Sequence, residues 1–176
     1  CAPVSLEDQW LKLQDKDPFD YAKVERKIPA SKELKVSFDL KAGQNNKGTL
    51  QIEFLDENGI ACSRMELTDD GIFRLKGGSR FANMMKYEAG KVYHVEAVLS
   101  TVDRNIQVYV DGKRVGLRMF YAPVAAVERI VFRTGVPRTF PTVDTPADQT
   151  YDLPNAGAQD PLAEYGIANV KTSSAD

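Results

Sequence analysis

The side chains best suited to bind or transform a ligand lie in residues 90–115, where two strand-like runs are separated by a polar turn. His94 is the single histidine, so any Ser-His-Asp or Cys-His mechanism would depend on it. Because alternate side chains of a strand share a face, Glu96 lies beside His94, and Gln107 and Tyr109 fit the same face of the next strand. This pattern predicts a polar, aromatic sugar-binding patch on the outer face of a sheet, with an ordinary half-exposed strand surface as the alternative. A zinc site is not indicated, because there is no second histidine and no cysteine nearby in sequence.

Aromatic rings and arginines elsewhere in the chain supply further groups for a carbohydrate. Rings that could stack on a sugar, and planar groups that could bind its hydroxyls, are Trp10, Tyr109, Phe120 and Tyr121, with Arg118 and Arg133. An acidic polysaccharide would also find partners for its carboxylates in Arg64, Arg74, Arg80, Arg118 and Arg133. The alternative for the aromatic rings is that they belong to the core, and the alternative for the arginines is that they are scattered surface charge. The predicted ligand-binding set is His94, Glu96, Gln107, Tyr109 and Arg133.

A retaining glycosidase needs two carboxylates on one strand face, about 5 Å apart. Glu53 and Glu57 have suitable parity, but Asp56 and Glu57 belong to the turn before Gly59, and a solvated strand end is the simpler interpretation. The sequence therefore predicts no catalytic residue and favours a protein that is not an enzyme. An enzyme whose active site is not recognisable, a glycoside hydrolase or a polysaccharide lyase, is the alternative.

Calcium is the metal that the sequence makes plausible, since Ca²⁺ takes six to eight oxygen ligands from loops. Asp15, Asp17 and Asp20 alternate with residues whose carbonyls could contribute. A second acidic group comprises Asp144, Asp148 and Asp152. Neither group matches the EF-hand pattern, and a turn around Pro18 that ends a strand is the alternative for the first.

Composition limits the classes of function. The chain has 176 residues, 43% hydrophobic and 27% charged, as expected for one domain with a substantial core. A net charge of −2 argues against a nucleic-acid partner, because such proteins need a basic surface. No apolar run approaches the roughly 20 residues that a transmembrane helix needs.

The two cysteines, Cys1 and Cys62, provide no disulfide framework, and their spacing leaves a 1–62 disulfide open. Cys1 is followed by Ala-Pro-Val-Ser, which is similar to the mature start of a bacterial lipoprotein, where this cysteine carries the lipid. The alternatives are a lipid-bearing start and a domain boundary.

Short alternating segments predict an antiparallel β-sandwich. Residues 33–42 place five apolar side chains on one face and five polar side chains on the other, which a helix could not do. Further strands are expected at 9–14, 21–28, 49–55, 61–67, 72–76, two within 90–115, and at 117–121, 128–134 and 165–171. Pro29 is expected to end its strand, and residues 80–89 fit a short helical turn or a loop.

Residues 135–164 are expected to form a long acidic, proline-rich loop inside the single domain predicted over 1–176. Five of the nine prolines lie in it, and residues 139–164 carry five acidic side chains with no Lys or Arg. A loop of this length usually binds something, covers a surface or is mobile.

The strand pattern resembles the concanavalin A-like, laminin G-like jelly roll. Tyr87-Glu-Ala-Gly-Lys-Val-Tyr-His-Val95 is similar to that family's approach to its central strand, and Val108-Tyr-Val-Asp-Gly-Lys-Arg-Val115 to its hairpin. Tyr165-Gly-Ile-Ala-Asn-Val170 resembles the terminal strand, which lies near the first strand in such folds. The resemblance implies a secreted or surface bacterial protein that handles polysaccharides.

The resulting expectation is a carbohydrate-binding or structural accessory module of a secreted, periplasmic or surface glycan-processing protein. The implied partners are an oligo- or polysaccharide and a catalytic domain of the same parent protein, with no nucleic acid. Calcium is the one cofactor considered.

Overall fold

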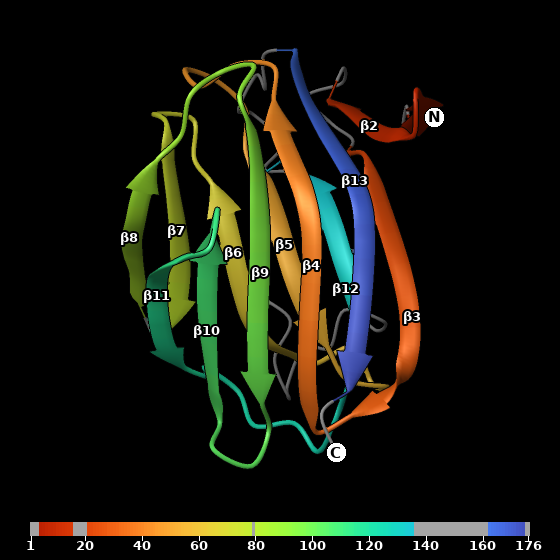
Figure 1. Ribbon diagram of the computed structural model, residues 1–176, viewed down its shortest axis with the longest axis vertical. Coiled ribbons are helices and arrows are strands. Elements are labelled where there is room, and N and C mark those ends of the chain that lie inside the picture. The colour runs from red at the N-terminus through yellow and green to blue at the C-terminus, as the bar shows by residue number, and fades with distance from the viewer. Residues whose placement is uncertain (1–3, 16–20, 79, 136–161, 175–176) are drawn as a thin grey trace.

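The computed structural model describes residues 4–15, 21–78, 80–135 and 162–174, which form a sandwich of two antiparallel sheets (Figure 1). The seven-stranded sheet contains, in spatial order, β1 (Val4–Glu7), β2 (Trp10–Asp15), β13 (Ala163–Ser174), β4 (Glu33–Ala42), β9 (Val92–Ser100), β10 (Asn105–Val110) and β11 (Lys113–Met119). The six-stranded sheet contains β3 (Lys23–Ser31), β12 (Val127–Thr134), β5 (Leu50–Leu55), β6 (Ala61–Leu67), β7 (Ile72–Gly77) and β8 (Arg80–Lys86). The predicted all-β antiparallel sandwich is confirmed. Nowhere among the described residues is there a helix that could span a membrane.

The core lies between the two sheets, where their apolar strand faces meet. Phe38 of β4 contacts Phe132 of β12 edge to face, with ring centroids 5.2 Å apart. The apolar face predicted for residues 33–42 is buried, and consists of Leu34, Val36, Phe38, Leu40 and Ala42. The polar face of β4 therefore points away from the core, to the outer side of the seven-stranded sheet.

The last strand lies between two early ones. β13 pairs with β2 on one side, through Tyr165 and Leu13, and with β4 on the other, through Tyr165 and Ala42. The predicted closeness of the terminal strand to the first part of the chain is confirmed. This pairing brings residues from both ends of the sequence onto one sheet face.

Several predicted boundaries were wrong. Residues 80–86 form β8 rather than a helical turn or loop, because they pair with β7, with a register shift at Phe73/Arg74. β3 continues through Pro29 to Ser31, since the irregular pairing between Val127 and Arg129 accommodates the missing N–H donor.

Differences also occur at both ends of the chain and in the central hairpin. β1 at Val4–Glu7 was not predicted. The strand expected at 117–121 is β11, which begins at Lys113 directly after the turn and ends at Met119. β13 begins at Ala163, so Glu164 belongs to a strand and not to the acidic loop; residues 136–161 lie outside the described residues.

Candidate functional site

The side chains of the seven-stranded sheet that point away from the core form a polar surface, here called the seven-strand face. Strand register aligns them in rows: Asp39 lies opposite His94, and Glu96 lies opposite Ser37 on one side and Tyr109 on the other. Four of the five predicted ligand-binding residues, His94, Glu96, Gln107 and Tyr109, lie on this face. Their predicted grouping on two neighbouring strands is confirmed, whereas their role in binding stays a prediction.

Two of these positions are already held by neighbours. The Tyr109 hydroxyl donates a hydrogen bond to Gln107 Oε1 at 3.0 Å. Glu96 forms an ion pair with Lys35 at 3.5 Å. These contacts leave an amide and a half-buried aromatic ring in fixed orientations on the sheet surface.

Asp39 connects His94 to the last strand through two hydrogen bonds. His94 Nδ1 lies 2.8 Å from Asp39 Oδ1, and Asn169 Nδ2 donates to Asp39 Oδ2 at 2.8 Å. The bond from Asn169 and the one from His94 lower the pKa of Asp39 below its usual value. An ionised carboxylate can only accept a hydrogen bond, so His94 Nδ1 carries the proton in its bond to Asp39. The other ring nitrogen, Nε2, takes no part in this bond. The His94 side chain is 52% exposed, so this nitrogen is available to a ligand.

Asn169 reaches Asp39 because the strand is irregular at that point. Asn169 has φ of 54°, and the pairing of β13 with β4 shifts between Ala168 and Lys171. A bulge of this kind redirects a side chain, and a positive φ in a residue other than glycine commonly marks a functional position. Sequence reasoning missed Asp39 and Asn169 as site residues. The polar phase of residues 33–42 placed Asp39 on the outer face, but no sequence signal indicated its partner 130 residues away.

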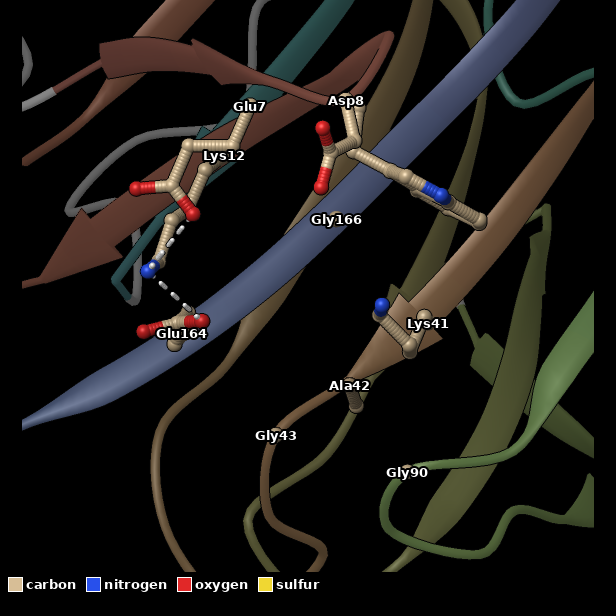
Figure 2. A pocket seen from close by; sticks show the side chains of 10 residues that line it. Glu7, Asp8, Lys12, Lys41, Ala42, Gly43, Gly90, Glu164 and Gly166 are labelled. Carbon is tan, nitrogen blue, oxygen red and sulfur yellow. Dashed lines mark hydrogen bonds and ion pairs between the residues drawn. The ribbon is translucent and has the colours of Figure 1, made fainter.

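A pocket of about 410 Å³ lies on the β2 side of this face, beside the only tryptophan. Its lining comes from β1, β2, β4, β13 and the adjacent turns, and consists of Glu7, Asp8, Trp10, Lys12, Lys41, Ala42, Gly43, Gly90, Glu164 and Gly166. Figure 2 shows Lys12 between Glu7 and Glu164, with Lys41 on the other side of β13. A second cavity of about 430 Å³ shares Gly43 and Glu164 with the first and lies at the ends of β2, β4 and β13.

Trp10 is held at this pocket by its neighbours. Lys41 Nζ lies 4.5 Å from the centre of the indole ring, within cation–π range. The ring also lies close to the backbone of Gly166, where an added Cβ would come within 3.0 Å of Trp10 Cε3. Glycine at this position therefore leaves room for the indole against β13.

Lys12 is fixed between two carboxylates, at 3.3 Å from Glu164 and 3.5 Å from Glu7. The hydrogen bond that Lys12 donates to Glu164 is the main reason that the pKa of Lys12 is raised. Glu7 is brought there by the turn between β1 and β2, in which Asp8 and Gln9 both have positive φ, of 48° and 67°. In a two-residue hairpin, a turn with positive φ at both central residues matches the right-handed twist of the flanking strands.

Arg133, the fifth predicted residue, lies on the other sheet. It is 5% exposed and stacks over the Tyr21 ring at 4.2 Å. The outer side of the six-stranded sheet, here called the six-strand face, carries buried ion pairs: Arg64 lies 3.0 Å from Glu53, and both side chains are almost fully buried. The solvated strand end expected over residues 53–57 is therefore wrong for Glu53, whereas Glu57 is exposed. Arg133 does not share a surface with His94.

The same face continues this polar layer. Glu66 accepts hydrogen bonds from Gln51 at 2.6 Å and from Arg74 Nε at 2.8 Å. Burial, followed by the charges of Arg64 and Arg74, lowers the pKa of Lys76. Matched, buried pairs of this kind fix strand pairing and leave little surface for a ligand.

Two aromatic residues considered as sugar platforms are packed into the protein. Phe120 contacts the main core, and Tyr121 packs against Leu55, Ala61 and Val131. Burial raises the pKa of the Tyr121 phenol well above its usual range. Neither ring is presented on the seven-strand face, so Trp10 and Tyr109 are the rings available there.

The predicted calcium ligands are only partly within the described residues. Asp15 ends β2 and is 2% exposed. Asp17 and Asp20 lie outside the described residues, as do Asp144, Asp148 and Asp152. In the described part of the chain, no group of three or more acidic, histidine or cysteine side chains is placed to hold a metal.

Cys62 is a free, fully buried thiol, so the 1–62 disulfide considered from the sequence is not formed. Burial raises the pKa of this thiol well above its ordinary value. A neutral, inaccessible thiol behaves as a small apolar core residue and is not a nucleophile.

An aromatic ring beside fixed polar groups, on the open face of a jelly-roll sandwich, is an arrangement typical of carbohydrate-binding domains. Comparison with known proteins agrees. The profile of the family described as "Sialidase-like, CBM domain" matches residues 1–149, and the chain belongs to this family. The expected carbohydrate-binding accessory module is thereby confirmed at the level of the family. No curated protein sequence matches the chain.

Solved structures include a chain titled sialidase, 87% identical with a TM-score of 0.87, which covers 99% of this chain. This chain spans only 16% of that sialidase. The carbohydrate-binding module CBM66 from Bacillus subtilis (10% identity, TM-score 0.56) covers 99% of this chain and is itself covered over 92%. A Bacillus licheniformis β-glucanase (10% identity, TM-score 0.65) covers 98% and is covered over 82%. At such low identity these two show the fold alone, and they confirm the concanavalin A-like jelly roll.

Proposed function

We propose that this chain is the glycan-binding accessory domain of a sialidase and that it binds its ligand on the seven-strand face. Membership of the sialidase-like CBM family supports the first part, as does the 87% identity to 16% of a sialidase chain. The role that follows is to hold a glycan surface near a catalytic domain of the same polypeptide, which raises the local concentration of substrate.

The observation that carries the proposal is the pocket beside Trp10. Its volume of about 410 Å³ is ample for a monosaccharide, and it combines an aromatic ring with the ammonium of Lys12 and the carboxylate of Glu164. A sugar can pack its apolar face on the ring while its hydroxyls bond to these charged groups. The Lys12–Glu164 contact fixes both side chains before a ligand arrives, which lowers the entropy lost on binding.

The remaining polar groups of the face extend this site across the sheet. Four strand spacings separate β2 from β10, or about 19 Å, with the Asp39–His94 pair between Trp10 and Tyr109. We infer that an oligosaccharide crosses the strands along this line and that His94 Nε2 and Gln107 bind its hydroxyls. In this proposal Glu96 and Tyr109 flank the chain.

A domain with this role works where extracellular glycans are present. We therefore propose that the parent protein is secreted or bound to the surface of a bacterial cell. A lipid on Cys1 would give such an anchor and stays a prediction, as does calcium at Asp15, Asp17 and Asp20.

The test uses the fact that Trp10 is the only tryptophan, so tryptophan emission, excited selectively over the seven tyrosines, reports on this pocket. A glycan array run with and without calcium would identify a ligand, and its titration should change Trp10 emission with a saturable dependence. Isothermal calorimetry should then show at least about tenfold weaker binding for Trp10→Ala, and a smaller loss for Trp10→Phe, since phenylalanine keeps an aromatic face.

Tyr21→Ala is the matched control, because it removes a half-buried ring from the six-strand face. It should change affinity by less than about twofold. A loss caused by Tyr21→Ala but not by Trp10→Ala would place the site on the other sheet. Absence of saturable binding to every glycan tested would refute the proposed function.

A further inference from the structure

The two edge strands on one side of the sandwich, β8 and β11, are strongly basic. Together they contain five basic residues and no acidic one, although the whole chain has a net charge of −2. All five are exposed: Arg80, Lys86, Lys113, Arg114 and Arg118. We infer that this cationic edge binds an anionic polysaccharide, whose carboxylate or sulfate groups pair with the five side chains.

The two strands come from different sheets but lie side by side, as Figure 1 shows at the edge where both sheets end. Met84 of β8 packs against Gly116 of β11, where an added Cβ would meet its sulfur at 2.6 Å. The aliphatic part of Arg118 lies over Gly77 at the end of β7, and Gly77 pairs with Arg80. Arg118 and Arg80 therefore lie close together at one end of this edge, from which β8 runs for about 20 Å to Lys86.

Several basic residues elsewhere in the sheets have acidic partners. Arg64, Arg74 and Lys12 are each paired with a glutamate. Among the ion pairs and side-chain hydrogen bonds formed between described residues, by contrast, none involves a member of the cationic edge. Clustered like charges raise the potential around this edge and attract an anionic polymer.

Protection of an exposed sheet edge against aggregation is a simpler use for edge lysines. Two observations favour a ligand. Three of the five residues are arginines, whose planar guanidinium can bind a carboxylate or sulfate through two hydrogen bonds. The edge also exposes Leu117 and Met119, at 48% and 57%, and such apolar side chains would weaken protection against aggregation.

Continuity with the seven-strand face identifies the ligand as a glycan, so this inference rests on the proposed function. Arg114 pairs with Tyr109 in the ladder between β10 and β11, and Tyr109 pairs with Glu96. A chain that crosses the seven-strand face past Tyr109 would reach Arg114 next. The ligand class is therefore a polysaccharide with negative charges at the β11 end of the site.

The test compares three polymers, heparin with sulfates and carboxylates, hyaluronan with carboxylates only, and neutral dextran. Binding of heparin or hyaluronan should weaken as salt is added, because ions screen exposed charges. Arg114→Gln combined with Arg118→Gln should weaken binding at low salt at least about tenfold, and Lys86→Gln on the other sheet should weaken it less. Lys27→Gln with Lys32→Gln removes two exposed charges elsewhere and should change affinity by less than about twofold.

Binding of heparin alone would assign sulfate as the recognised group, and binding of both polyanions would assign carboxylate as sufficient. An equal loss in the Lys27/Lys32 control would overturn the inference, because it would show attraction by overall charge. So would increased aggregation of the arginine variant with unchanged binding. If the domain binds a neutral glycan at Trp10 but neither polyanion, only this inference is overturned. If it binds a polyanion but no glycan at Trp10, the proposed function is overturned and the role of the cationic edge is retained.

Discussion

Replacement of Glu53 by glutamine should strongly destabilise the domain, because it leaves a buried positive charge without its carboxylate. Arg64 is fully buried and Glu53 is 2% exposed, with Oε1 and Nη2 3.0 Å apart. Breaking a buried pair in this way costs about 3–5 kcal/mol. For a chain of 176 residues, each kcal/mol corresponds to roughly 2–4 °C, so the melting temperature should fall by about 6–20 °C.

Urea unfolding followed by circular dichroism measures this loss directly. The double variant Glu53→Leu with Arg64→Met is the control, since replacing both charges by apolar groups is often neutral or stabilising. If Glu53→Gln lowers the free energy of unfolding by less than about 1 kcal/mol, the range found for exposed ion pairs, the Glu53–Arg64 pair is not desolvated and the reasoning is refuted. Below its melting temperature, this variant should bind glycan as the original chain does, because the pair lies on the six-strand face.

Four further outcomes are expected. Gly166→Ala should weaken glycan binding about tenfold in the fluorescence titration, because the new Cβ would lie 3.0 Å from Trp10 Cε3 and displace the indole. Gly48→Ala should lower the free energy of unfolding in urea by about 2–4 kcal/mol, since Gly48 has φ of +70° and the Cβ would meet Ala163 at 2.3 Å. The pKa of Asp39 is lowered on folding, so the stability that this carboxylate contributes is present above its unfolded pKa of about 3.9 and is lost as the pH falls further. Asp39→Asn should therefore make the free energy of unfolding less dependent on pH in this acidic range. The domain should release no reducing ends from any glycan that it binds, and turnover would instead favour the enzyme.

The fold was predictable wherever one strand face meets the core and the other meets water. Residues 33–42 show this alternation, and β4 has those bounds. Residues 80–86 do not, because they form an edge strand whose side chains are neither clearly buried nor clearly polar. Their pairing with β7 also contains a register shift that no local pattern encodes.

The candidate site was predictable only where it depends on neighbouring strands joined by a short turn. Parity placed His94 and Gln107 correctly on one face, because β9 and β10 form a local hairpin. The hydrogen bond between Asp39 and Asn169 requires pairing between distant segments. Parity also gives the face of a strand but not which sheet the strand joins, and this is why Arg133 was grouped with His94.

The two outer faces of the sandwich differ in how their polar groups are satisfied, and this difference assigns the binding face. On the six-strand face the charges of Glu53 and Arg64 are paired and removed from water, so they contribute to stability and leave a ligand little to bind. On the seven-strand face, His94 is oriented by Asp39 but remains 52% exposed, so a ligand can bind it at little entropic cost. Substitutions should therefore separate into two groups, with those on the six-strand face changing the free energy of unfolding and those on the seven-strand face changing glycan affinity.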